Sequence, residues 1–206
     1  MRRLSMVLVG FLAAAPASAD SDAEHARYSV VASAGDFEIR DYAPQIVAET
    51  TVAGERDAAI KEGFRRLAGY IFGDNAGAGK IAMTAPVEQQ PQGQKIAMTA
   101  PVAQARAGDA WVVRFTMPAE LTMASLPKPN NAAVRLAQAP GKRIAALRFS
   151  GLAGDDDLAA NEAKLVEELN IRGLGAKGPA VYAFYDPPWT LPWNRRNEIL
   201  VEVDHK

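Results

Sequence analysis

Residues 37–72 read FEIRDYAPQIVAETTVAGERDAAIKEGFRRLAGYIF, and the spacing of their apolar side chains changes once along the stretch. Phe37 to Tyr42 alternates apolar and polar residues, which is typical of a half-buried strand. After Pro44, residues 45–52 alternate again and are rich in β-branched side chains, which favours a second strand. From Glu55 to Phe72 the apolar residues follow a helical period. The stretch therefore predicts two strands followed by a helix.

The predicted helix has one apolar face. Its regularly spaced apolar residues are Ile60, Phe64, Leu67 and Ile71. This spacing places all four side chains on the same side of an α-helix, where they can pack against a sheet. Gly73 is placed to end the helix, and residues 74–79 are expected to form a loop.

The order of elements is repeated in the second half of the chain. A strand expected over residues 111–117 ends the first half, and strands are expected in the second half over residues 134–138, 143–149, 180–185 and 198–203. Asp155 to Asp157 are expected to cap a second helix and to favour its start by their charge. The two halves, Phe37–Met117 and Val134–Val203, each read strand-strand-helix-strand-strand. The predicted fold class is α+β: two pseudo-symmetric ββαββ halves that form a twisted antiparallel barrel or sandwich flanked by two helices.

One octamer occurs twice within the first half. The sequence KIAMTAPV fills residues 80–87 and again residues 95–102, with a polar linker between the copies. In a strand, Ile96, Met98, Ala100 and Val102 would share one face. We expect the second copy to form an extra strand or the arm of an extended hairpin.

Composition excludes several functional classes. The chain has 206 residues, of which 23 are Lys or Arg and 24 are Asp or Glu, so it lacks the basic surplus of a nucleic-acid-binding protein. With no cysteine, it can form no disulfide, thiolate nucleophile or covalent c-type haem linkage. Its two histidines, His25 and His205, are too few for a multi-histidine metal site.

The first 19 residues have the pattern of a secretory signal peptide. Arg2 and Arg3 precede an apolar run from Met6 to Ala15, and Ala17-Ser18-Ala19 resembles a signal-peptidase site. The run is about half the ~20 residues that a membrane span needs, so we expect cleavage, with no integral membrane span afterwards. Residues 20–27 are expected to form a loose leader and residues 28–206 a single domain. The expected location is periplasmic or secreted.

Five short motifs in order resemble the SOUL haem-binding family. The first is YIFGDN at residues 70–75, followed by the octamer at 80–87. The others are WVVRFTMP at 111–118, LPKP at 126–129, FSG at 149–151, and YDPPW at 185–189 followed by RRNE at 195–198. The resemblance spans about Tyr28 to Val203.

The resemblance implies a twisted barrel flanked by helices, shared with bacterial effector-binding modules, and a non-covalently bound haem b or related tetrapyrrole. It places the porphyrin in an apolar cleft between the first helix and the loop before the last strand, with basic side chains at the propionates and no strong protein axial ligand. The corresponding side chains in this sequence are Phe64, Arg65, Arg66, Leu67, Trp189, Leu191, Trp193 and Arg195.

The residue types in these two segments suit a porphyrin. Trp189 and Trp193 lie on a loop stiffened by prolines, so that little entropy is lost when it binds a flat ligand. Arginine matches the geometry of carboxylates. Each side chain also has a structural interpretation: Phe64 and Leu67 as core, the helical arginines as a solvated face, and the tryptophans packed on the barrel. Glu198 is expected to fix the loop through salt bridges.

Signals for metal ligation or catalysis are weak. Methionine in an alternating strand is usually core, so Met83 and Met98 are not expected to bind iron, and Tyr70, Tyr182 and Tyr185 are expected to be structural. The glycines of residues 73–79 do not form a phosphate-binding loop, because Lys80 is followed by Ile81.

The sequence thus predicts a carrier or buffer for haem or a related tetrapyrrole, with no catalytic residues and no protein metal ligand. Two alternatives stay open: a module that binds another flat apolar effector, and an enzyme that modifies tetrapyrroles by removing the metal. The oligomeric state is not indicated.

Overall fold

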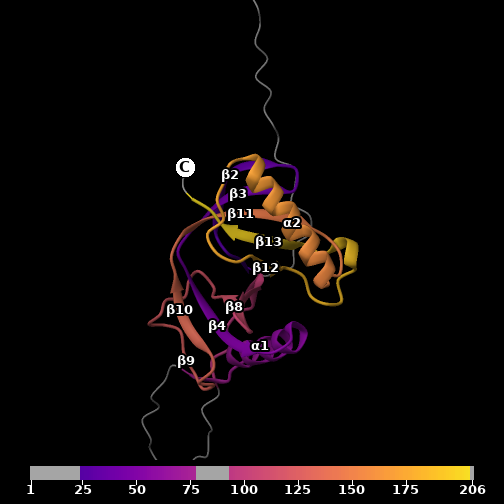
Figure 1. Cartoon of the computed structure of the whole chain (residues 1–206). Helices are drawn as coiled ribbons and strands as arrows, with labels where there is room; N and C mark the ends of the chain where they lie inside the picture. The colour runs from indigo at the N-terminus through magenta and orange to yellow at the C-terminus, as the bar shows by residue number, and fades with distance from the viewer. Residues whose placement is uncertain (1–23, 78–92, 205–206) are drawn as a thin grey trace, which may run out of the picture.

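A computed structural model of the chain describes residues 24–77 and 93–204. In this part of the chain, nine antiparallel strands form a sheet curled into a half-barrel, flanked by the helices α1 and α2 (Figure 1). The helices are α1 (Arg56–Ile71), α2 (Asp155–Ile171) and the short 3-10 helix η1 (Pro192–Asn194). The sheet contains β2 (Tyr28–Ala34), β3 (Phe37–Tyr42), β4 (Gln45–Ala53), β7 (Val102–Ala107), β8 (Ala110–Thr116), β10 (Arg135–Ala139), β11 (Lys142–Phe149), β12 (Val181–Phe184) and β13 (Asn197–Glu202).

The predicted α+β class and the order of elements in both halves are confirmed. The strands lie in the order β10-β4-β8-β7-β12-β13-β11-β3-β2. Each half thus contributes its first strand to the other: β3 pairs with β11 of the second half, and β10 pairs with β4 of the first. This exchange joins the two halves into one sheet. The edge strand β2 was not anticipated from the sequence.

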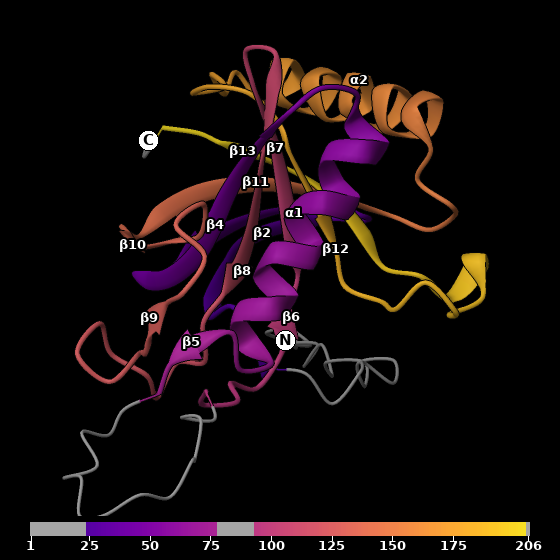
Figure 2. The same cartoon turned by 90° about the horizontal axis from the view of Figure 1, so that it is seen from below.

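Both helices cover the same face of the sheet. Val113 on β8, Gln104 on β7, Tyr182 on β12 and Ile199 on β13 are successive cross-strand partners, so their side chains share that face. Leu67 and Ile71 of α1 pack there against Val113 and Phe115, and Leu165 and Leu169 of α2 pack against Ile199. The helices therefore build two cores, one over each half of the sheet (Figure 2).

The residues expected to end a loose leader are attached to the domain. β1 (Glu24–His25) pairs in parallel with β6 (Thr99–Ala100), and the Ala26 N–H donates to the Ala100 carbonyl. Ala43 N–H likewise donates to the Arg27 carbonyl. These backbone bonds hold residues 24–27 against the end of the half-barrel. The expected signal peptide lies outside the described residues.

The second octamer is only in part the extra strand that was expected. Thr99 and Ala100 form β6 and Val102 begins β7, whereas residues 95–98 lie outside any strand. Pro101 has no N–H to continue a ladder between β6 and β7. Ile96 is buried in the core under α1, and its N–H donates to the Ile71 carbonyl at 2.8 Å. The second octamer therefore packs against the last turn of α1 and bonds to its last residue. The first copy of the octamer lies outside the described residues.

The start of α2 differs from the prediction in one respect. Asp155 to Asp157 form the first turn, but the N-cap is Gly154 and no side-chain hydrogen bond caps the helix. The three carboxylates therefore favour the helix start only through their charge.

At the other end of the first half, β5 (Asn75–Ala76) pairs with β9 (Lys128–Pro129) below the end of α1. Neither helix of the described part combines the length and apolarity of a membrane-spanning helix.

Candidate functional site

The loop between β12 and β13 exposes three large apolar side chains. Trp189 is 81% exposed, Leu191 52% and Trp193 69%. Exposed apolar groups gathered in this way are typical of a binding surface. The alternative that the tryptophans pack on the barrel is wrong for this structure. The loop projects beyond the end of β12, beside α2 in Figure 1.

Hydrogen bonds fix the shape of this loop. Arg195 donates from Nε to the Thr190 carbonyl at 2.8 Å and from Nη2 to the Pro188 carbonyl at 2.5 Å. Arg196 N–H donates to Asp186 Oδ2 at 2.6 Å. The indoles are thus presented on a preorganised backbone. Arg195 was expected to bind a propionate, but its guanidinium bonds to carbonyls of the loop and holds the loop's shape.

A neighbouring loop extends the apolar surface. Gly151 N–H donates to the Pro192 carbonyl at 2.9 Å, and Asn197 Nδ2 donates to the Gly151 carbonyl at 3.2 Å. Leu152, which follows Gly151, is 68% exposed. We call the exposed side chains of Leu152, Trp189, Leu191 and Trp193 the indole patch.

The α1 candidates fall into two groups. Leu67 is fully buried in the core, because its position on the helix faces β8, so the prediction that it contacts a ligand is wrong. Phe64 lies at the edge of that core: it is 40% exposed, and its ring meets that of Phe115 edge-on at 5.4 Å. Phe64 therefore keeps apolar surface available beside the helix.

The two arginines on α1 are already paired. Arg65 Nη2 lies 2.8 Å and Arg66 Nε 2.6 Å from Glu62 Oε1. Hydrogen bonds from Arg65 and Arg66 lower the pKa of Glu62 to about 2. The Arg65 side chain is 74% exposed, so it can turn from Glu62 to another carboxylate at little cost, since exposed ion pairs add little stability.

Apart from the buried Leu67, the α1 candidates and the loop candidates reach the surface without direct bonds between the two groups. Within the described residues, no hydrogen bond, ion pair or ring contact joins the two groups. Figure 2 shows α1 in front of the sheet and η1 projecting to one side of it. Neither of the two cavities described next is lined by any of the eight candidates. Neither cavity is therefore the apolar cleft that was expected between α1 and the loop before β13.

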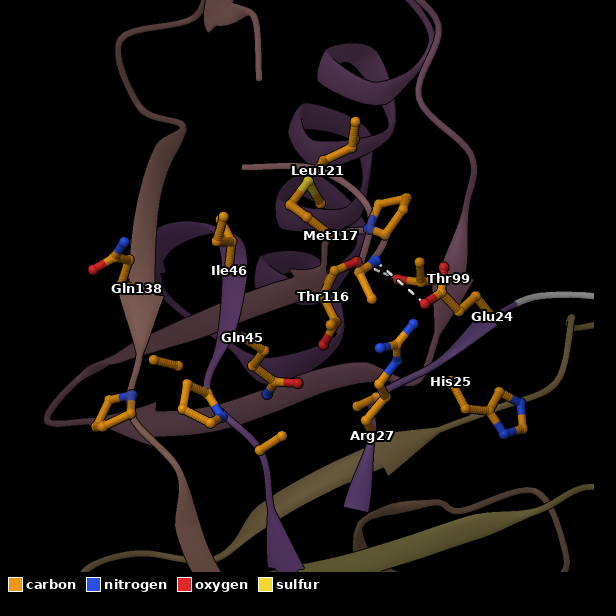
Figure 3. A pocket seen from close by; sticks show the side chains of 17 residues that line it. Glu24, His25, Arg27, Gln45, Ile46, Thr99, Thr116, Met117, Leu121 and Gln138 are labelled. Carbon is orange, nitrogen blue, oxygen red and sulfur yellow. Dashed lines mark hydrogen bonds between the residues drawn. The ribbon is translucent and has the colours of Figure 1, made fainter. Parts of the chain in front are cut away.

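The first cavity has a volume of about 570 Å³ and lies at the end of the half-barrel where β4 begins and β8 ends (Figure 3). Its walls come from residues 24–27, 43–46, 116–119 and 138–140, together with Thr99 and Leu121. The second, of about 460 Å³, lies between the first turns of α1 and α2, over Trp111 and Tyr182. In it, Arg56 Nη1 lies 3.0 Å from Asp155 Oδ1, linking the two helices.

An ionic centre lies on the sheet face away from the helices. Glu198 is fully buried and receives two hydrogen bonds from Arg40, at 2.6 and 2.9 Å, one from Arg196 at 3.0 Å and one from the Tyr185 hydroxyl at 2.7 Å. Burial alone would raise the pKa of Glu198, but hydrogen bonds and charge from Arg40 and Arg196 lower it below its usual value. The expectation that Glu198 serves salt bridges is confirmed. Arg40 was missed, because its partner is 158 residues away in the sequence.

Comparison with known proteins identifies the family. A model of the SOUL heme-binding protein family matches residues 23–202. This chain belongs to the SOUL heme-binding family. Heme-binding protein 2 of Mus musculus and that of Homo sapiens are each 46% identical to it over 54 residues, which is 26% of this chain and 26% of each relative. The match thus spans about a quarter of the length of these curated relatives.

Solved structures share the SOUL fold at low sequence identity. The C-terminal domain of EcmrR has a TM-score of 0.57 at 11% identity, covering 87% of this chain and 99% of that one. A hydrolase from Listeria innocua has a TM-score of 0.54 at 11% identity, covering 84% and 94%. At this level of identity the likeness shows the fold alone.

The SOUL motifs contact one another in pairs. In the helix-exit motif, the Tyr70 hydroxyl donates to the Pro127 carbonyl of the LPKP motif at 2.9 Å. In the second pair, Gly151 of the FSG motif bonds to Asn197 of the C-terminal motif and to Pro192, which lies between the two parts of that motif. These motifs therefore include residues that hold loops in place, and they do not by themselves mark ligand contacts.

The tyrosines considered as iron ligands in this SOUL domain, and His25, contact other side chains or backbone groups. The hydroxyls of Tyr182 and Tyr185 donate to Glu162 and Glu198, at 2.8 and 2.7 Å. The His25 ring lies edge-on against Tyr185 at 5.5 Å and points away from the other side chains of the first cavity (Figure 3). In the described ranges, no three His, Asp or Glu side chains are grouped in a way that would hold a metal ion.

Proposed function

We propose that this SOUL-family chain binds haem or a related tetrapyrrole without a covalent bond, with one face of the macrocycle against the indole patch. The observation that carries the proposal is the exposure of two indoles on a loop whose backbone is fixed by hydrogen bonds. The family match and the heme-binding relatives support the choice of ligand. The residues present fit the apolar part of a haem.

Burial of the patch supplies the main driving force. Covering a large apolar side chain contributes about 1.5–3 kcal/mol, so the two indoles contribute roughly 3–6 kcal/mol before the entropy of association is subtracted. Because the loop is already ordered, less of this gain is lost in fixing its conformation. Phe64 extends the apolar contact toward α1.

The propionates require cations at the rim. Arg65 is the candidate with the most accessible guanidinium, and Arg66 forms an ion pair with the same carboxylate, Glu62. Arg195 contributes indirectly, by positioning the loop. A bound haem would supply an iron with open coordination positions, and we assign no protein ligand to it. Binding therefore depends on apolar contact and on ion pairs.

A titration of the purified chain with hemin tests this proposal. We expect a saturable shift of the Soret band at micromolar protein, weakened at least tenfold by the double variant Trp189→Ala/Trp193→Ala. Trp111→Phe is the matched control, because Trp111 lies on β8 away from the loop. Both indoles are exposed, so the double variant should unfold within about 0.5 kcal/mol of the unchanged protein. An equal Soret shift in the double variant would place haem elsewhere.

The biological role that we propose is that of a carrier or buffer in the periplasm or outside the cell, and not that of an enzyme. The signal-like pattern of residues 1–19 supports the location. The binding role is supported by the full pairing of Glu198, which would have to release Arg40 before it could exchange a proton with a substrate. Metal-free porphyrin fluorescence after incubation with hemin would contradict the assignment as a binding protein.

A further inference from the structure

The cavity at the end of the half-barrel is separate from the indole patch and has its own chemistry. Figure 3 shows side chains from β1, β4 and β10 around it, together with the end of β8 and the residues that follow. Its volume of about 570 Å³ lies within the range of small-molecule sites, about 300–1,000 Å³.

The cavity is lined by one cation that forms no ion pair with the described residues, and by one carboxylate. Glu24 and Arg27 are the charged residues of its lining. Glu24 uses Oε1 to accept the Ala119 N–H at 3.2 Å. The Arg27 guanidinium makes no hydrogen bond or ion pair with the described residues, and in Figure 3 it points toward Thr116 and Glu24. A carboxylate is the group that an arginine fork binds best.

A second polar group in the wall lacks a partner. Gln45 Oε1 is buried and accepts no hydrogen bond from the described residues. Such an acceptor is costly when left unsatisfied, so the site favours a ligand that brings an O–H or N–H donor. The Thr99 hydroxyl does not compete for this role, because it donates to the Thr116 carbonyl.

Much of the rest of the wall is apolar and stiff, although His25, Thr99, Thr116 and Gln138 also line it. The apolar part includes Ile46 and Leu121, three prolines and four alanines. Proline and alanine lose little side-chain entropy when a ligand packs on them. The site therefore combines apolar surface with one cation, the Glu24 carboxylate and one unsatisfied acceptor.

We propose that this cavity binds a small amphipathic carboxylate whose apolar body carries a hydroxyl or amide donor. Arg27 binds the carboxylate, Gln45 Oε1 accepts the donor, and Ile46 and Leu121 contact the apolar body. The site is independent of the proposed haem surface, because the two have no lining residue in common.

Calorimetric titration of the purified chain with 3-hydroxydecanoate, decanoate and decanol tests the proposal. We expect 3-hydroxydecanoate to bind more tightly than decanoate, and decanol to bind at least tenfold more weakly than decanoate. Arg27→Gln should weaken decanoate binding at least tenfold, whereas Arg106→Gln, a surface arginine outside this lining, should leave it unchanged. Gln45→Met should weaken the binding of 3-hydroxydecanoate and leave the binding of decanoate unchanged. Thermal unfolding checks that each variant is folded.

Several outcomes would overturn the assignment. They are equal binding of decanol and decanoate, an Arg27→Gln variant with unchanged affinity, or no heat from any of the three probes at millimolar concentration. Displacement of decanoate by hemin would show one shared site and overturn the independence of the cavity. Because decanoate is titrated without haem, failure of hemin to bind leaves this test intact.

Discussion

Arg40 on β3 and Glu198 on β13 form a two-bonded ion pair across the sheet, with Nη1–Oε2 and Nη2–Oε1 distances of 2.6 and 2.9 Å. Both side chains are almost completely buried. The pair joins the first strand of the first half to the last strand of the second. Burying two charges is costly, so the pair is sensitive to the loss of either partner.

We expect Arg40→Met to lower the free energy of unfolding by about 3–5 kcal/mol, because it leaves Glu198 buried with one arginine fewer. Arg40→Met/Glu198→Leu removes both charges and should lose clearly less than the sum of the two single losses. Urea unfolding at pH 7 measures all four proteins. Additive losses would show that the two side chains act independently.

Stability should fall in acid through Glu198. Its pKa is lowered in the folded protein relative to about 4.3 when unfolded, so its contribution is present above that value and is lost as pH falls through the folded pKa. The difference in free energy of unfolding between the unchanged protein and Glu198→Gln should therefore shrink between pH 5 and pH 3. Glu49, whose pKa is also lowered, is present in both proteins and cancels. A difference independent of pH would contradict the assignment.

Two glycines of α1 should respond to alanine in opposite directions. A Cβ on Gly63 would lie 2.5 Å from Val113 Cγ2, so Gly63→Ala should destabilise the protein by about 1–3 kcal/mol through overpacking. A Cβ on Gly69 would meet no heavy atom closer than 3.9 Å, so Gly69→Ala should stabilise by up to ~1 kcal/mol through helix propensity. Thermal unfolding distinguishes the two. Shifts of the same sign would show that α1 does not pack on β8 at Gly63.

Asn75 should be the polar residue that holds the end of α1. Its Nδ2 donates to the Tyr70 and Gln94 carbonyls at 2.7 and 2.8 Å, and its Oδ1 accepts the Gln94 N–H at 2.9 Å. Asn75→Leu leaves these groups without partners and should lower the free energy of unfolding by roughly 1–3 kcal/mol.

The matched control for Asn75 is Asn130→Ala. Asn130 is exposed and donates to Asp74 Oδ1 at 3.2 Å, so its loss should change the free energy of unfolding by no more than about 0.5 kcal/mol. Equal effects of the two substitutions would mean that residues 93–94 are not anchored through Asn75.

The candidate site was predictable only in part. The tryptophans were found because two indoles between prolines are conspicuous in any sequence. Leu67 was misassigned to the ligand, because helical periodicity shows an apolar face but not what covers it. Arg27, Gln45 and Arg40 gave no local signal, because their surroundings include β8, β10 and β13, which lie far away along the chain.

By itself the sequence determined the elements and their order, because hydrophobic periodicity is a property of neighbouring residues. It yielded the strand over residues 37–42, the helix near 56–71 and the repeated ββαββ order. The tertiary structure alone decided that β3 and β10 exchange halves, that Arg40 and Glu198 meet, and that a cavity remains beside Arg27. Strand pairing and burial depend on contacts between distant segments, and their energies are settled only when the whole sheet closes.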